Sequence, residues 1–451
     1  MRHGAPTLSG SPIRAAMLAV VFAGLAAPVA RAQQPSAPGA QAQNLSRDER
    51  RIAAWVDAHT EEAIGFLERT VNVNSGTLNL AGVREVARLY QPEFEALGFT
   101  ARWIPMPDSV HRAGHLFAER TGTRGRRVLF IGHLDTVYEA DSPFQRFVRE
   151  GDRATGPGTN DMKGGNAVIL YALKALAAAG ALDGTRIIVA FTGDEESVGR
   201  PHAVSRRDLV EAAQRSDVTL EYETAVRDSA VEYGTVARRG ATGWRLETTG
   251  RTAHTSGIFS RGAGSGAIFE AARILHRFHE ELREQYVTFS AGVIVGGTEA
   301  QLENGRGTAE GKGNVVPRTV LVSGDLRTLF PDQEQRLRDR MRAIVAEHLP
   351  QTGATIVFQD GYPPMAPTPG NQRLFEMLNV VTRDMGLPAM QVLPPEQRGA
   401  SDASFAAPYT DVLSGLGAYG GSAHAPGEWI DLASFALQIK RTAILLYRLT
   451  R

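Results

Sequence analysis

Runs of apolar residues alternate with amphipathic segments over the first half of the chain. Continuous apolar runs predict strands that are buried on both faces, at 127–132, 186–192 and 218–222. Segments with helical spacing lie between or before them, at 48–71, 83–97, 163–179 and 205–215. Strands that alternate with helices in this way predict an α/β fold with a mostly parallel sheet. A helix at 371–385 and a strand at 411–416 resume the same pattern near the C-terminus.

A different pattern occupies the region between these two parts. Alternating apolar and polar residues at 242–249 predict a half-exposed strand, and further strands are expected at 286–295, 315–327 and 354–359. Helices are expected at 263–284 and 333–348. Two helices among four antiparallel strands predict a small α+β domain, ferredoxin-like, inserted into the larger one. The predicted divisions are 45–235 and 351–451 for the larger domain and 236–350 for the inserted domain.

The first 32 residues have the features of an export signal. Arg2 and Arg14 precede an apolar run at 15–27 that is too short to span a bilayer, and Ala30-Arg31-Ala32 supplies small residues for cleavage. Residues 33–44, rich in Gln, Ala and Pro, predict a flexible leader. We therefore expect an exported protein, periplasmic or extracellular, with no membrane attachment after cleavage.

Composition narrows the chemistry. The 451 residues contain 49 Lys and Arg, 49 Asp and Glu, and no cysteine. Removal of residues 1–32 takes away three arginines and no acid, so the remaining chain is slightly acidic and offers no electrostatic reason to bind nucleic acid. Without cysteine, any metal site must be built from histidine and carboxylates.

Acids and histidines gather where the predicted strands end. His133 and Asp135 lie two residues apart on extended chain, so both point to one side and Asp135 can orient the imidazole of a metal-bound His133. Glu195 and Glu196 are adjacent and point to opposite sides, which suits one metal ligand and one group that holds water. Taken alone, this acidic pair also suits a solvated loop.

Three more candidates complete the set. Asp161 lies in a turn-rich loop before a helix, Glu223 follows a predicted strand, and His424 lies in a glycine-rich loop. Taken alone, Asp161 also suits a helix cap. The carboxyl ends of strands in one α/β sheet are where such sheets bind ligands. Five ligands of mixed nitrogen and oxygen character, one of them able to bridge, suit a centre of two zinc ions.

Eight short motifs occur in one order: GHLDTV, GPGTNDMKGGNAV, TGDEES, LEYE, GRTAH, GNVVP with DLR, SDAS, and GSAH. In this order they resemble the di-zinc exopeptidase family that contains glutamate carboxypeptidase, aminoacylase and succinyl-diaminopimelate desuccinylase. The glutamate carboxypeptidase branch is the most similar. The resemblance covers essentially the whole chain after the export signal, and it implies that the inserted domain is a lid and dimerisation domain.

The resemblance implies a role for each candidate. Asp161 would bridge two Zn²⁺ ions, or Co²⁺ or Mn²⁺ in their place, and the peptide bond after it would be cis. His133 with Glu223 would hold one ion and Glu196 with His424 the other; Glu195 would be the general base. In the inserted domain, His254 would stabilise the oxyanion in the partner subunit's site. Asn314 and Arg327 would hold the substrate carboxylate.

The implied activity is that of a homodimeric metallo-exopeptidase. Relatives with Glu at the position of Glu223 act as carboxypeptidases or acylases, so we expect hydrolysis of an amide bond next to a C-terminal carboxylate, with a peptide or an N-acyl amino acid as substrate. An aminoacylase or a dipeptidase remains an alternative on the same site. An exported binding protein that kept the fold without catalysis is a third hypothesis, although no ligand or base is missing.

Overall fold

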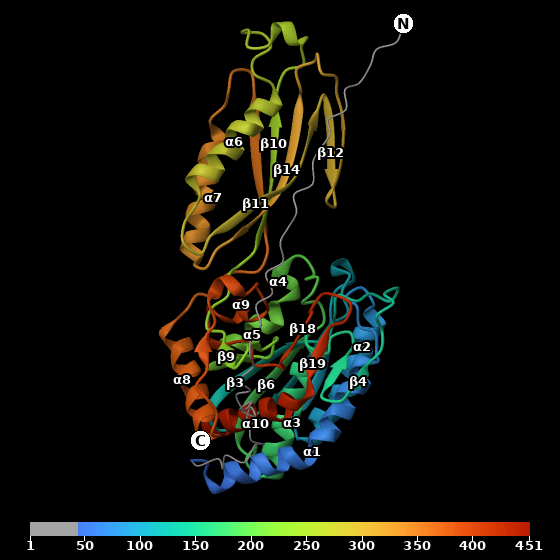
Figure 1. Cartoon of the computed structure of the whole chain (residues 1–451), viewed down its shortest axis with the longest axis vertical. Helices are drawn as coiled ribbons and strands as arrows, with labels where there is room; N and C mark the ends of the chain where they lie inside the picture. Colours follow the sequence, from blue (N-terminus) through green and yellow to red (C-terminus); the bar gives the residue numbers. More distant parts are fainter. Residues whose placement is uncertain (1–43) are drawn as a thin grey trace, which may run out of the picture. The chain divides into compact units, whose positions relative to one another are not determined.

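The computed structural model describes residues 44–451 and shows a mixed α/β fold (Figure 1). The predicted export signal and all but the last residue of the predicted leader lie outside the described residues. The largest sheet has six strands in the order β1-β2-β6-β3-β7-β17. Its strands are β1 Thr100–Pro105, β2 Gly114–Arg120, β3 Arg124–His133, β6 Thr185–Thr192, β7 Val218–Glu221 and β17 Asp411–Leu413. β6, β3, β7 and β17 pair in parallel, whereas β1 and β2 form an antiparallel edge.

Helices cover both faces of this sheet, as the apolar runs predict. On β3, Val128 and Phe130 belong to one core, whereas Leu129 and Ile131 belong to a second core on the opposite face. The first core includes helices α1 Arg47–Val71, α2 Leu80–Ala96, α3 Lys163–Ala178, α8 Pro369–Asp384 and α10 Leu432–Leu449. The second includes α5 Arg207–Gln214 and α9 Ala403–Ala406. A strand buried on both faces carries apolar residues at every position, which explains its continuous run.

A separate core lies within the inserted segment. Four antiparallel strands form a sheet in the order β11-β14-β10-β15, and α6 and α7 lie on one face of it (Figure 1). Trp244 and Leu246 on β10 face the helices, whereas Arg245 and Glu247, which alternate with them along the strand, are exposed. The elements are β10 Thr242–Thr249, α6 Ala267–Glu281, β11 Thr288–Gly297, β14 Thr319–Arg327, α7 Pro331–Ala346 and β15 Gly353–Asp360.

Short elements complete the described part of the chain. A hairpin, β12 Glu299–Glu303 with β13 Arg306–Glu310, lies between β11 and β14 in sequence. Two small sheets contain β8 Val226–Asp228, β9 Val231–Gly234 and β16 Gln391–Val392, and β4 Val148–Glu150, β5 Arg153–Thr155, β18 Gly420–Gly421 and β19 Trp429–Asp431. The remaining helical turns are α4 His202–Ser205, η1 Asp108–Val110, η2 Thr255–Gly257 and η3 Pro395–Gln397. No helix within 44–451 is long and apolar enough to cross a membrane.

The structure adds elements that the pattern does not predict. β1 is the edge strand and Arg102 on it is exposed, whereas β2 lies between β1 and β6 and its first five residues are buried. Neither shows a long continuous apolar run, since the apolar part of β2 is only Leu116 to Ala118. Helix α10 packs against both α1 and α3. Its second half carries consecutive buried residues from Arg441 to Leu446, so neighbouring elements enclose much of this helix.

Two helical glycines provide a matched test of this packing. A Cβ atom on Gly165 in α3 would lie 2.0 Å from the carbonyl oxygen of Tyr222, whereas a Cβ on Gly65 in α1 would meet no atom within 4 Å. We expect Gly165→Ala to lower the free energy of unfolding by about 2 kcal/mol or more, since the backbone must shift. Gly65→Ala should raise it by about 0.5–1 kcal/mol. Chemical denaturation measures both, and equal effects would contradict this description of the α3 interface.

Candidate metal centre

Five side chains converge at the carboxyl edge of the parallel strands. His133 is the last residue of β3, Glu196 follows β6, and Glu223 lies two residues beyond β7. Asp161 occupies the turn before α3, and His424 lies between β18 and β19. Parallel strands end at the same edge of a sheet, so three of the five are brought together by topology alone.

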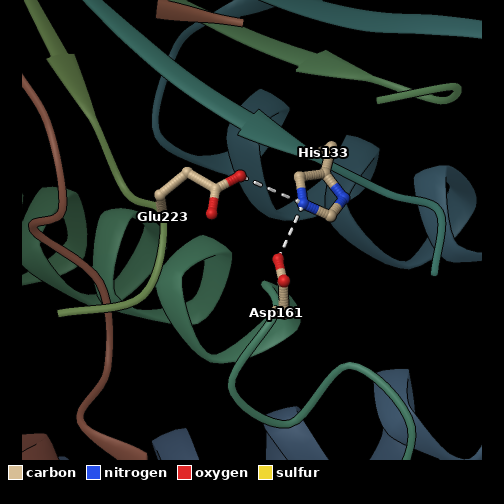
Figure 2. Close-up of side chains that lie close together, drawn as sticks. All are labelled: His133, Asp161 and Glu223. Atoms are coloured by element: carbon tan, nitrogen blue, oxygen red, sulfur yellow. Dashed lines mark hydrogen bonds and ion pairs between the residues drawn. The ribbon is translucent and has the colours of Figure 1, made fainter. Parts of the chain in front are cut away.

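One group contains His133, Asp161 and Glu223 (Figure 2). The Nε2 atom of His133 lies 3.1 Å from Oδ1 of Asp161 and 3.4 Å from Oε1 of Glu223. All three residues are buried, and their potential ligand atoms lie within 4.8 Å of one another. Figure 2 shows both carboxylates directed at the same imidazole nitrogen, which is the arrangement that a cation between them would require.

A second group shares Asp161 with the first. The Nε2 atom of His424 lies 3.1 Å from Oδ2 of Asp161 and 3.0 Å from Oε2 of Glu196. The two oxygens of Asp161 therefore face different histidines, one in each group. The structure brings the five predicted ligands together in the expected grouping, with Asp161 common to both. Their ligation of metal stays a prediction.

Burial and charge crowding dominate the electrostatics of the two groups. Burial raises the pKa of Glu196 to about 7. Hydrogen bonds to Asp161 and Glu196 raise the pKa of His424 to about 11. For Asp161, hydrogen bonds from His133 and His424 lower the pKa although burial opposes them. The carboxylates thus use the two imidazoles as their positive partners, and a donor set of this nitrogen and oxygen character fits divalent cations such as zinc.

Asp135 contacts the centre in more ways than the sequence predicts. The Nδ1 atom of His133 lies 3.0 Å from the main-chain carbonyl oxygen of Asp135 and 3.4 Å from its carboxylate, so the carbonyl is the closer acceptor. With a cation bound, a proton held on Nδ1 would leave the Nε2 lone pair available as its ligand. The carboxylate of Asp135 accepts the main-chain N–H groups of Glu195 at 3.0 Å and Glu196 at 3.1 Å. It therefore orients the acidic loop as well.

Glu195 lies beside the two groups without joining either. Within the described residues its carboxylate makes no hydrogen bond or ion pair, whereas its main-chain carbonyl accepts the phenol O–H of Tyr362 at 2.7 Å. Burial and the charge of Glu223 raise the pKa of Glu195 well above its usual range. A carboxylate with a raised pKa and no fixed partner can take up and return a proton.

The loop that carries Asp161 is held by a residue that the sequence analysis does not single out. Glu428 is buried, and its carboxylate accepts the N–H groups of Gly158 at 3.1 Å, Asn160 at 2.7 Å and Asp161 at 2.8 Å. Glu428 follows His424 by four residues, so it connects the loops of two predicted ligands. The only sequence signal is an acid shortly after that histidine, which is weak by itself. The Asp161–Met162 peptide bond is cis, as the resemblance implies.

The predicted residues of the inserted domain lie in two places. Main-chain hydrogen bonds from Thr255 to Asn314 and from Val316 to Ala253 bring His254 and Asn314 onto adjacent segments. His254 is exposed, and its Nδ1 atom lies 2.9 Å from Oγ of Ser256.

Arg327 ends β14 and pairs with Asp325 at 2.6 Å. Across residues 44–451, His254, Asn314 and Arg327 make no hydrogen bond or ion pair with the five predicted ligands. Their roles toward a substrate stay predictions.

Known proteins are similar to this chain in sequence and in fold. A family model described as peptidase family M20/M25/M40 matches residues 129–448. Carboxypeptidase G2 from Pseudomonas sp. (strain RS-16) is 26% identical over 395 residues, which cover 85% of this chain and 88% of that protein. Succinyl-diaminopimelate desuccinylase from Gluconacetobacter diazotrophicus is 26% identical over 366 residues, with 78% and 89% covered. The crystal structure of aminopeptidase PepT from Bacillus cereus has a TM-score of 0.67 at 17% identity and covers 87% of this chain and 99% of that one.

Glu428→Gln tests the role of the buried carboxylate. Glutamine keeps the size but offers one acceptor oxygen, so its amide N–H₂ would face one of the main-chain N–H groups that Glu428 now accepts. We expect a lower melting temperature and metal affinity weakened by roughly 10-fold to 100-fold, because groups that support ligands have effects of this size. Differential scanning calorimetry and titration with Zn²⁺ measure these changes. Glu376→Gln, on the exposed side of α8, is the control; unchanged affinity in Glu428→Gln would refute the role.

Proposed function

This chain belongs to the peptidase family M20/M25/M40, and from that premise we propose that it is a carboxypeptidase-like exopeptidase. It is therefore a hydrolase of a metal-dependent family whose members typically have a centre of two metal ions. The proposed reaction is hydrolysis of the amide bond next to a C-terminal carboxylate. One observation carries the proposal: Asp161 is shared by two groups of potential ligands, and beside them lies the carboxylate of Glu195, which has no hydrogen-bond or ion-pair partner within residues 44–451.

The proposed centre holds two cations. His133, Asp161 and Glu223 would hold one, and Asp161, Glu196 and His424 the other. We propose Zn²⁺, with Co²⁺ or Mn²⁺ as alternatives, because the donors are imidazole nitrogens and carboxylate oxygens. When bound, such a pair of ions acts as a Lewis acid toward a carbonyl oxygen and lowers the pKa of water.

Glu195 is the proposed general base. It takes a proton from the attacking water while the water oxygen bonds to the scissile carbonyl carbon. It then gives that proton to the nitrogen of the leaving amine as the carbon–nitrogen bond breaks. The raised pKa of Glu195, which comes from burial and the charge of Glu223, supports both steps, because a base of low pKa would be a poor proton donor afterwards.

The inserted domain supplies the remaining proposed roles. His254 would stabilise the oxyanion in the partner subunit's site within a homodimer, and Arg327 and Asn314 would hold the substrate carboxylate. An exposed imidazole at the start of η2 is free to reach another subunit. Arg327 has one carboxylate partner, Asp325, on its own strand and presents a guanidinium that suits bidentate binding of a carboxylate.

An N-acyl amino acid amidohydrolase or dipeptidase is the second candidate. The desuccinylase relative spans most of both chains and supports this alternative on the same centre. A binding protein without catalysis is the least favoured hypothesis, since all five predicted ligands and Glu195 are present and close together.

Export to the periplasm or the extracellular space is also our proposal. N-terminal sequencing of the exported protein should give a first residue of Gln33, and an intact Met1 would refute cleavage.

A substrate profile tests the proposed function. Protein loaded with Zn²⁺ or Co²⁺ is assayed on peptides and acyl amino acids with C-terminal glutamate, on other N-acyl amino acids, and on free dipeptides. We expect release of the C-terminal residue only from substrates with a free terminal carboxylate. Glu195→Gln should retain two metal ions by elemental analysis and lose roughly 10³-fold or more of kcat, because the proton carrier is gone. Full activity in that variant would refute the mechanism, and no activity of the wild type on any substrate would revive the binding-protein hypothesis.

Mixing of variants tests the proposed contribution of the partner. His254→Ala should keep its metal and lose most of its kcat, by about 10²-fold, as expected when a group that stabilises an oxyanion is removed. Mixed dimers of His254→Ala with Glu195→Gln would contain one site with both an intact base and the partner's histidine. We therefore expect partial recovery of activity after subunit exchange. No recovery, with exchange verified by mass spectrometry, would exclude the contribution from the partner.

A further inference from the structure

A buried arginine lies behind the acidic loop that carries Glu195. Arg206 joins α4 to α5 and is 1% exposed, and its two acidic partners, Asp194 and Asp402, are 0% and 1% exposed. Asp194 immediately precedes Glu195, whereas Asp402 lies 196 residues after Arg206 in the chain. Asp194 and Asp402 lie in the motifs TGDEES and SDAS, whereas Arg206 lies in none of the eight motifs.

Arg206 holds Asp194 through both its side chain and its main chain. Its Nη1 atom donates to Oδ1 of Asp194 at 2.5 Å, and its Nη2 atom donates to the carbonyl oxygen of Asp194 at 3.2 Å. The second carboxylate oxygen of Asp194 accepts the N–H of Gly199 at 2.8 Å. A hydrogen bond between its first and last residues therefore closes the loop 194–199, and Arg206 anchors its first residue.

The carbonyl of Asp194 and the N–H of Glu195 belong to one planar peptide unit. Arg206 binds its carbonyl oxygen, and the carboxylate of Asp135 accepts its N–H at 3.0 Å. With both ends of the plane held, the direction in which the side chain of Glu195 leaves the backbone is restricted. The next N–H, that of Glu196, is also held by Asp135.

The other side of Arg206 faces the loop that contains Asp402. Its Nε atom donates to Oδ1 of Asp402 at 2.7 Å, and Oγ1 of Thr192 donates to the other oxygen at 2.6 Å. Arg206 thus joins the end of β6 to a segment from the last quarter of the chain. Its guanidinium is the one group that contacts both carboxylates within the described residues.

Stability alone does not account for this cluster. One buried cation with two buried carboxylates carries a desolvation cost that its attractions often fail to offset, so apolar replacements of such clusters are frequently as stable or more stable. The cluster does, however, define geometry, because a planar guanidinium fixes the directions of several hydrogen bonds at once.

We propose that Arg206 is a positioning residue: it holds the peptide plane between Asp194 and Glu195 and thereby aims Glu195 and Glu196 at the metal centre. The inference rests on the proposed function, in which Glu195 is the general base. A displacement of about 1 Å in a catalytic group can cost about 10²-fold in rate. Loss of the guanidinium should therefore lower kcat more strongly than it weakens substrate binding.

Arg206→Lys is the central test, because lysine keeps the charge but cannot contact Asp194, its carbonyl and Asp402 together. We expect kcat to fall by about 10-fold to 100-fold with KM changed by less than about threefold, and two metal ions to remain bound. Asp402→Asn, which loosens Arg206 without removing it, should show a smaller fall of the same kind. Arg207→Lys, at the neighbouring exposed arginine, should match the wild type.

A readout independent of turnover separates this inference from the proposed function. In Co²⁺-loaded Arg206→Lys, the visible absorption of the ion should differ from that of the wild type, since Glu196 lies in the same loop. An unchanged spectrum together with unchanged kcat would overturn the positioning role. Two other results would also overturn the positioning role. One is a loss of activity that matches the loss of folded, metal-loaded protein, and the other is failure of both Arg206→Lys and Asp402→Asn to fold. In either case the cluster would serve stability alone. If the wild type hydrolyses no amide, the proposed function fails and the spectrum still decides the role of Arg206.

Discussion

The burial of several carboxylates at one edge of a sheet is the constraint on which this structure depends. Asp135, Asp161, Glu196, Glu221 and Glu223 lie where β3, β6 and β7 end, and ionised carboxylates in such surroundings need compensation. Two imidazoles contact four of them. The raised pKa of Glu196, caused by burial, indicates that this compensation is incomplete within the chain. A centre with more negative than positive charge is suited to hold cations.

Carboxylates in and around this centre also accept main-chain N–H groups. Glu428 accepts three N–H groups of the loop before α3, and Asp135 accepts two from the loop after β6. Glu221 accepts the N–H of Ala403 and the hydroxyls of two serines. Each of these acids thereby fixes the conformation of an irregular loop near the predicted ligands. This explains how side chains carried on turns, rather than on helices or strands, reach distances near 3 Å from one another.

The same physics decides what could be predicted from the sequence. The parallel strands were predictable because burial on both faces requires continuous apolar runs. The proximity of His133 and Glu223 was predictable because parallel strands end at one edge of a sheet, whereas that of Asp161 was implied by the family resemblance. β1 was not, since an exposed edge strand tolerates polar residues, and β2 was not, since its run of apolar residues is only three long. Glu428 was not predictable either, because an acid that binds main-chain N–H groups requires no particular residue type at its partners. The contact of Arg206 with Asp402 spans 196 residues and has no local signature.

His424 and Glu428 lie near the C-terminus, far in sequence from the residues that they contact. Glu428, for example, binds main-chain groups 267 to 270 residues before it. A growing polypeptide that has already formed β3, β6, β7 and α3 carries four of the five predicted ligands but still lacks His424 and strand β17 of the main sheet. Contacts of such long separation form late, because the loop they close costs entropy before any bond repays it. The second group of potential ligands, which contains His424, is therefore completed by the last part of the chain to be synthesised.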